Sequence, residues 1–265
     1  MVLAILLLAS LAGCQQLGDA LKDRRRRQTP AAGIPSLDQH SLAKTRTPKQ
    51  RGDVQMALAR SFEKQGHVEQ AAHLYEDMVQ KDSSRADALH RLAVLHDKKG
   101  DCKTAERYYR AALKREPDNA EAYCDLGYSY YLQQRWEEAE KRLVKAVSLQ
   151  PELARAHNNL GLLLARTGRE EEALAQFAKA GCSEADARAN LAFGLTLDEQ
   201  WYAAQRQFEL ALAADPDSSV AKRGLEALRS LTSEAASAPK MLAVDESQPK
   251  PLPQNNRTEL RIANR

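Results

Sequence analysis

The sequence has few of the residues that build reactive or metal-binding sites. It contains 4 cysteines among 265 residues, and Cys102, Cys124 and Cys182 have neither CxxC spacing nor a histidine partner four residues on. A zinc site or a redox pair is therefore not expected, and these thiols are expected to be small buried or half-buried residues. No GxSxG, HExxH, GxGxxG, P-loop or EF-hand pattern is present, and the histidines are scattered. We expect no enzyme activity, no cofactor and no metal.

Long hydrophobic runs are also missing. Residues 1–14, MVLAILLLASLAGC, are apolar or small and uncharged, a run shorter than the ~20 residues of a transmembrane helix but typical of a signal-peptide core. The run ends in Leu11-Ala12-Gly13-Cys14, which resembles the lipobox of bacterial lipoproteins. This resemblance implies cleavage before Cys14 and acylation of that residue, with several acyl chains giving a stable anchor. Gln15, rather than aspartate, resembles proteins sorted to the outer membrane of diderm bacteria.

Two features of this N-terminal region favour other interpretations. A signal peptide normally begins with Lys or Arg, which this one lacks, and Arg24–Arg27 follows the apolar run closely. Positive charge tends to stay on the cytoplasmic side of a membrane. An uncleaved membrane-associated segment and a cytoplasmic protein therefore remain open beside the lipoprotein of the bacterial envelope.

Charge of one sign is not in large excess, but it is unevenly distributed. Residues 15–51 carry nine Lys and Arg against three Asp and Glu, and residues 52–230 carry 25 against 29. The mildly acidic central part argues against a nucleic-acid partner. Aromatic residues make up 5% and charged residues 28% of the chain, which is typical of long helical arrays.

What the chain does have is an internal repeat. Two consecutive 34-residue blocks, 86–119 and 120–153, share one register. A leucine marks that register at Leu58, Leu92, Leu126, Leu160 and Leu191, and an alanine follows it by thirteen residues at Ala71, Ala105, Ala139, Ala173 and Ala204. A fixed period of this length indicates a repeat array. Five blocks follow, at residues 52–85, 86–119, 120–153, 154–184 and 185–218.

Each block has the pattern of a helical hairpin. Apolar residues recur at helical spacing on both sides of a turn such as Lys99-Gly100-Asp101, and Pro117 ends the block. Gly127 and Gly161 allow two helices to approach closely, beside the larger Leu143 and Phe177. Because one hairpin cannot bury its apolar side alone, neighbouring hairpins must stack.

These residues resemble the tetratricopeptide repeat, a helix–turn–helix unit of 34 residues. The third block fits best, with Tyr123, Leu126, Gly127, Tyr130, Ala139, Leu143, Ala146 and Pro151. The resemblance covers roughly residues 52–230 and implies an all-α solenoid of five hairpins, with a capping helix at 219–230. A basic linker at 15–51 and a tail at 231–265 are expected to be disordered, since periodicity is lost there and prolines interrupt both.

In such solenoids the inner face formed by the first helices generally holds a peptide or a partner helix. The residue before each marker leucine should point there, and asparagine can both donate to and accept from a peptide backbone. Tyrosines and a phenylalanine one turn on would add apolar contact, and two arginines could receive a carboxylate. The aromatic residues could equally pack between helices. The predicted partner-binding residues are Arg91, Asp125, Tyr128, Tyr131, Arg155, Asn158, Asn159, Arg166, Asn190 and Phe193.

The architecture predicts a membrane-tethered protein-interaction scaffold whose partner is another protein or peptide rather than a small molecule. It resembles the tight-adherence pilus assembly lipoproteins and the type IV pilus secretin pilotins, which implies a role in assembling a pilus or secretion machine. An adaptor that recruits an envelope enzyme, such as a peptidoglycan hydrolase, is the alternative. A soluble cytoplasmic adaptor is a third possibility.

Overall fold

The computed structural model describes residues 48–237, and this part of the chain consists of helices without strands. The prediction of an all-α solenoid is confirmed. The helices are α4 (Pro48–Gln65), α5 (Val68–Lys81), α6 (Ala86–Lys98), α7 (Cys102–Arg115), α8 (Ala120–Leu132), α9 (Trp136–Leu149), α10 (Ala154–Arg166), α11 (Glu170–Lys179), α12 (Glu184–Leu197), α13 (Trp201–Ala214) and α14 (Ser219–Ser237).

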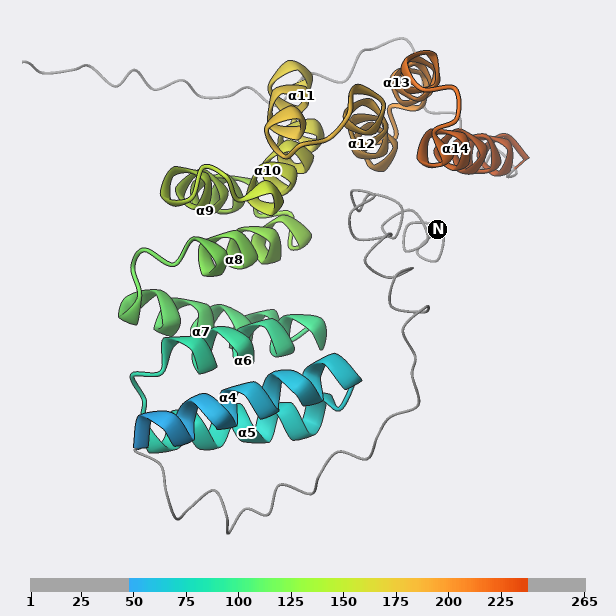
Figure 1. Ribbon diagram of the computed structural model, residues 1–265. Coiled ribbons are helices and arrows are strands. Elements are labelled where there is room, and N and C mark those ends of the chain that lie inside the picture. Colours follow the sequence, from blue (N-terminus) through green and yellow to red (C-terminus); the bar gives the residue numbers. More distant parts are fainter. Residues whose placement is uncertain (1–47, 238–265) are drawn as a thin grey trace, which may run out of the picture.

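Consecutive helices pair into five hairpins, from α4–α5 to α12–α13, and α14 packs on the last one. The hairpins stack in chain order into a curved array, with α9, α11 and α13 on the outer side of the bend (Figure 1). The first helices of neighbouring hairpins touch one another, α8 with α10 and α10 with α12. The chain therefore presents a continuous row of first helices along one face.

The repeated residues form the core of the array. The five alanines of the second helices, from Ala71 to Ala204, are fully buried, and Leu126 and Leu191 are equally inaccessible. A large ring or leucine fills the space beside them at Tyr75, Tyr109, Leu143, Phe177 and Phe208. Because each hairpin contributes the same positions, burial continues from one hairpin to the next, as expected for a solenoid.

The turns within the hairpins need a left-handed backbone at one position. Glycine occupies it at Gly66, Gly100 and Gly168, with φ of +86°, +80° and +74°, whereas Gln134 and Glu199 adopt it with φ of 59°. The backbone N–H of Gln134 donates to the carbonyl of Tyr131 over 3.0 Å. Two of the five turns therefore adopt the left-handed conformation without glycine, the residue that adopts it most easily.

The ends of the array differ from the predicted bounds. Helix α4 begins at Pro48, four residues before the predicted block at 52, because proline fits the first position of a helix. Helix α14 continues to Ser237 rather than stopping at 230, since Leu231 extends the apolar side formed by Leu225 and Leu228. These two segments are helical where the basic linker and the tail had been predicted.

The rest of the predicted linker and tail, and the predicted signal peptide with Cys14, lie outside the described residues. None of the helices between residues 48 and 237 is both long and apolar enough to cross a membrane.

Candidate partner-binding face

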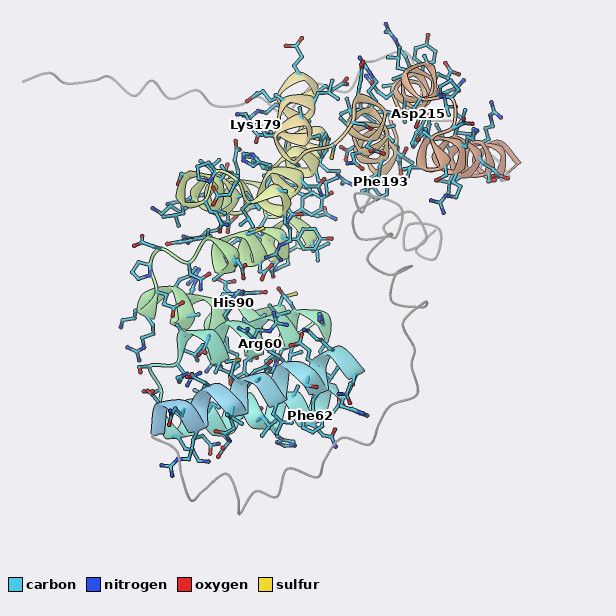
Figure 2. All side chains as sticks on the ribbon, in the orientation of Figure 1. Arg60, Phe62, His90, Lys179, Phe193 and Asp215 are labelled. Atoms are coloured by element: carbon cyan, nitrogen blue, oxygen red, sulfur yellow. The ribbon has the colours of Figure 1, made fainter. Side chains whose placement is uncertain are left out.

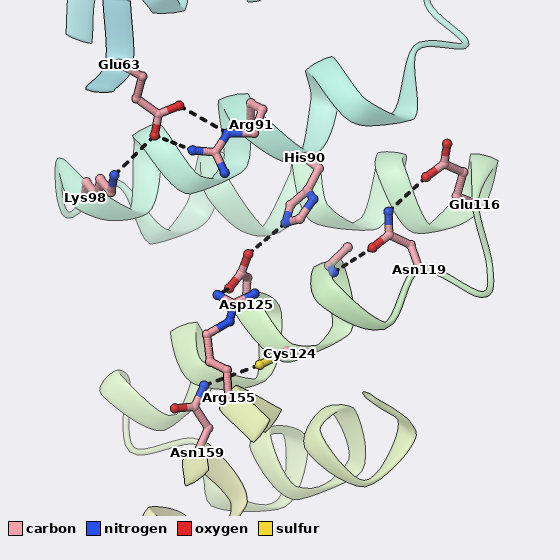
Figure 3. A network of polar contacts seen from close by, with 11 residues as sticks. Glu63, His90, Arg91, Lys98, Glu116, Asn119, Cys124, Asp125, Arg155 and Asn159 are labelled. Carbon is pink, nitrogen blue, oxygen red and sulfur yellow. Dashed lines mark hydrogen bonds and ion pairs between the residues drawn. The ribbon is translucent and has the colours of Figure 1, made fainter. Parts of the chain in front are cut away.

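A network of charged and polar side chains joins the first helices of the array (Figure 3). On α4, Glu63 accepts hydrogen bonds from both Nε and Nη2 of Arg91 on α6, with 3.2 Å for Nε, and lies 3.3 Å from Lys98 Nζ. Burial alone would raise the pKa of Glu63, but the hydrogen bonds and charges of Arg91 and Lys98 lower it. One carboxylate thus serves two cations.

The next carboxylate along the row is Asp125 on α8. It lies 2.8 Å from His90 Nε2 on α6 and also forms an ion pair with Arg155 on α10. Burial alone would raise the pKa of this carboxyl, but His90 and Arg155 lower it. Asp125 therefore connects three consecutive hairpins, and both it and Arg155 have partners within the array.

Of the three predicted asparagines, Asn158 is half-buried and the other two are largely inside the array. Asn159 and Asn190 are only 8% and 4% exposed. The Asn159 amide donates to Cys124 Sγ at 3.4 Å, and the Asn190 amide reaches Asn158 Oδ1 at 3.5 Å. Burial raises the pKa of the Cys124 thiol to about 11, so this group stays a neutral acceptor. Both amides are used between neighbouring helices, which leaves little of either side chain for a peptide backbone.

The predicted aromatic residues are divided between surface and core. Tyr128 is 39% exposed and stacks on Tyr131, with 5.8 Å between ring centroids, while Tyr131 and Phe193 are buried. Tyr131 in turn meets the edge of Trp136. Of these predicted residues, Tyr128 therefore offers the largest accessible ring, and Tyr131 and Phe193 act mainly in packing.

Arg166 belongs to the same region. Its guanidinium lies 5.5 Å from the centre of the Trp136 ring and forms a 3.0 Å ion pair with Asp198, the residue that follows α12. Burial raises the pKa of the Asp198 carboxyl, and the Arg166 charge only partly offsets that rise. Arg166 is thus occupied by an aromatic ring and a carboxylate of the array.

A hollow of about 600 Å³ lies between α4, α6 and the beginning of α8. Sequence reasoning singled out only Arg91 among its lining residues, although Lys64 and Lys98 occur one repeat length apart. Figure 2 shows Arg60 and His90 on the neighbouring helices α4 and α6. The hollow is lined by Arg60, Glu63, Lys64, Asp87, His90, Arg91, Lys98, Asn119 and Glu121.

Between residues 48 and 237, no three His, Cys, Asp or Glu side chains are grouped so that they could hold a metal ion. The polar groups of this face are arranged in pairs across helices rather than around one point. Their chemistry is that of hydrogen bonding and charge recognition.

Family models agree with the geometry. Models of the tetratricopeptide repeat match residues 56–101 and 90–146, and a further TPR repeat model matches residues 127–168. The array has the fold of a tetratricopeptide-repeat solenoid. Tetratricopeptide repeats serve as protein-interaction scaffolds, and no enzyme family is among these matches. No curated protein matches the chain by sequence.

Solved tetratricopeptide-repeat structures are similar over most of their length. PilF of Pseudomonas aeruginosa is 25% identical with a TM-score of 0.53, over 71% of this chain and 87% of that one. PilW, described as a widely conserved type IV pilus biogenesis factor, is 19% identical with a TM-score of 0.55, over 71% and 94%. YrrB, described as having an unusual peptide-binding site, is 24% identical with a TM-score of 0.51, over 65% and 90%.

Proposed function

We propose that this protein is a membrane-tethered scaffold of the bacterial envelope that binds a segment of a partner protein on its first-helix face. In this proposal the scaffold helps to assemble a pilus or secretion machine. The lipid on Cys14 holds it to the membrane, the outer membrane in a diderm bacterium. The tetratricopeptide-repeat array is the part that meets the partner.

The observation that carries the binding role is the open hollow between α4, α6 and α8, which lies along the same row of helices as the exposed Tyr128. Helix faces that leave both polar donors and an aromatic ring accessible are typical of protein-binding surfaces. The tether rests on the lipobox-like Leu11–Cys14. The assembly role rests on the resemblance to pilus assembly lipoproteins, and PilW, described as a type IV pilus biogenesis factor, has the same fold.

Site-specific photocrosslinking tests the binding face. A photoreactive amino acid replaces Tyr128 on α8, and in a matched variant it replaces Tyr202 on α13, a tyrosine that is 84% exposed on a second helix. We expect an adduct with one partner from position 128 and none from position 202. Adducts of equal yield from both positions, or none from either, would contradict the proposal.

The identity of the crosslinked protein separates the functional alternatives. A pilus subunit or a secretin supports the assembly role. A peptidoglycan hydrolase would instead show an adaptor that recruits an envelope enzyme.

Fractionation tests the tether. We expect Cys14→Ala to move the protein from the membrane fraction to the soluble fraction. The control is Cys102→Ala, a half-buried thiol at the start of α7, which leaves it in the membrane fraction. Equal membrane attachment of both variants would contradict lipidation of Cys14, and a soluble wild-type protein would indicate the cytoplasmic adaptor.

A further inference from the structure

The hollow between α4, α6 and α8 contains more cations than its carboxylates neutralise. Arg91 and Lys98 share Glu63. Arg60 and Lys64 are exposed on α4, and neither has an ion-pair partner among the described residues. The hollow therefore carries positive charge that is open to a ligand.

The other carboxylates do not remove this excess. Asp87 accepts hydrogen bonds from Arg85 Nε and Nη2 at 2.9 and 2.7 Å. Burial alone would raise the pKa of Asp87, but Arg85 lowers it, with a smaller contribution from Arg60. Asp87 is therefore engaged by an arginine outside the lining, and Glu121, at the far end on α8, is the remaining acid of the hollow.

The side chains exposed on the same row change from cationic to apolar along the array. In the repeat register, Arg60 on α4 corresponds to Tyr128 on α8, and Lys64 and Lys98 correspond to Leu132. Leu132 is 62% exposed and lies one turn beyond Tyr128, on the same side of α8. A basic region over α4 and α6 thus adjoins an apolar region at the end of α8.

We infer that the partner segment is an acidic stretch of polypeptide followed by apolar side chains. Its carboxylates occupy the hollow beside Arg60, Lys64 and Lys98, and its apolar residues contact Tyr128 and Leu132. This inference rests on the proposed function and specifies the chemistry of the partner. Complementary charge steers the encounter and fixes which end of the segment lies over α4.

A polypeptide fits this site better than a lipid surface does. The cations line a recess between three helices rather than a protruding edge. An extended polypeptide can enter such a recess and pair with cationic side chains on both α4 and α6. A flat bilayer, by contrast, contacts only side chains that project from the protein surface. The acidic peptide is therefore the occupant that we test.

The test measures binding of a fluorescent peptide to the full-length protein by anisotropy. The probe is a short peptide of several glutamates followed by leucines and a phenylalanine, and the comparison peptide has glutamine in place of each glutamate. We expect the acidic peptide to bind at least about tenfold more tightly at low salt. We also expect this preference to shrink when salt reduces the Debye length from about 10 Å to about 3 Å.

Charge reversal locates the site. The variant Arg60→Glu/Lys64→Glu should weaken binding of the acidic peptide about tenfold, because it replaces two exposed cations of the hollow. The matched control, Lys141→Glu/Lys145→Glu, makes the same charge change on exposed residues of α9, a second helix, and should leave affinity within about twofold. Circular dichroism checks that both variants keep the helical content of the wild type. Equal binding of the acidic and neutral peptides, or equal weakening by both double variants, overturns the inference.

The apolar part has its own variant. Leu132→Ser, at an exposed site, should weaken the same peptide but leave a peptide of glutamates alone unaffected. An identical effect on both peptides overturns the assignment of α8 to the apolar end. Binding to phosphatidylglycerol vesicles that falls with Arg60→Glu/Lys64→Glu, without any peptide binding, would show a membrane contact and likewise overturn the inference.

Failure of this inference can be distinguished from failure of the proposed function. If the crosslink from position 128 forms in cells with unchanged yield in the Arg60→Glu/Lys64→Glu background, the scaffold binds its partner without the positive charges of the hollow. The proposed function then stands and the acidic segment is wrong. If no crosslink forms even in the wild-type background, the proposed function itself fails.

Discussion

Two aspartates on neighbouring first helices have pKa values that shift in opposite directions. Asp97 on α6 accepts a 2.8 Å hydrogen bond from Ser129 Oγ, but burial and the charge of Asp125 raise its pKa despite that bond. Burial acts in the same direction on Asp125, whose side chain is 14% exposed, yet His90 and Arg155 lower its pKa. The difference lies in the partners, since Asp97 has neutral donors and Asp125 has a guanidinium.

Asp125→Asn should lower the free energy of unfolding by about 1–2 kcal/mol at neutral pH, because the buried His90 and the half-exposed Arg155 lose the carboxylate between them. A carboxyl group whose pKa is lowered by folding stabilises the folded protein at pH values above its pKa in the unfolded chain. This contribution is lost as the pH falls through the group's pKa in the folded protein. The difference between wild type and variant should therefore shrink below about pH 4. Urea denaturation at several pH values measures it.

Asp97→Asn is the matched control for this prediction. Because folding raises the pKa of the Asp97 carboxyl, its ionised form lowers the stability of the folded protein at neutral pH. This loss disappears as the pH falls through the group's pKa in the folded protein. An asparagine can still accept the bond from Ser129. We expect this variant to be as stable as the wild type or slightly more stable. A loss equal to that of Asp125→Asn would contradict the opposite roles of the two carboxyl groups.

At the residue scale, sequence spacing identified the packing positions better than the binding positions. Leu126 and Ala139 are buried as their recurrence implies, because every repeat must fill the same space. The register also placed Asn159 and Asn190 on the row of first helices, but it could not show that their amides would be used by Cys124 and Asn158. Side-chain partners in adjacent repeats depend on the distance between hairpins, which spacing along the chain does not specify.

At the scale of elements, the turn between α8 and α9 contains backbone strain that a glycine would remove. Gln134 has a φ of 59°, which costs a residue with a Cβ about 1–2 kcal/mol, and its side chain is exposed. Gln134→Gly should therefore raise the free energy of unfolding by about 0.5–1 kcal/mol, after the larger chain entropy of glycine is subtracted. Thermal and urea unfolding measure the change.

The neighbouring Gln133 is the control, since its φ of −83° suits any residue. Gln133→Gly should destabilise by about 0.5–1 kcal/mol. It also removes the bond from Gln133 Nε2 to the carbonyl of Ser129. Stabilisation by both substitutions, or by neither, would contradict the role of the left-handed turn.

Close approach of the two helices in the fourth hairpin depends on Gly161. A Cβ there would lie 2.6 Å from Cε1 of Phe177, a ring that is fully buried and cannot move aside. The overlap costs about 1–3 kcal/mol and outweighs the roughly 1 kcal/mol that alanine gains in a helix. Gly161→Ala should therefore lower the midpoint of urea unfolding.

The same substitution elsewhere shows whether crowding is the cause. At Gly52 in α4, a Cβ meets the end of the Arg85 side chain, which can swing away. Gly52→Ala should leave stability unchanged or raise it by up to about 1 kcal/mol. If Gly161→Ala were no more harmful than Gly52→Ala, the contact with Phe177 would not be what requires glycine.

At the scale of the whole molecule, the number and order of the hairpins could be predicted from the 34-residue register, because each repeat packs only on its neighbours. The hollow between α4, α6 and α8 could not. Its shape depends on how far each hairpin turns relative to the previous one, and on long side chains such as Arg60 and Lys64 whose positions no periodicity determines. Repeats specify a fold, while irregular surface residues specify a binding site.

A solenoid should respond to core truncation according to its place along the array. Leu126→Ala and Leu228→Ala each remove a buried side chain, at a local cost of about 2–5 kcal/mol. Leu126 lies in the third of five hairpins, so its loss should uncouple the two halves and speed amide hydrogen exchange across most helices. Leu228 lies in α14, so exchange should accelerate in α13 and α14 and stay unchanged in α4 to α8. The reason is that each hairpin is stabilised only by contacts with the adjacent hairpins. Hydrogen exchange with mass spectrometry resolves the two patterns. If both variants accelerated hydrogen exchange equally in all helices, the array would unfold as a single cooperative unit. A change in α14 would then also destabilise the hollow between α4 and α6.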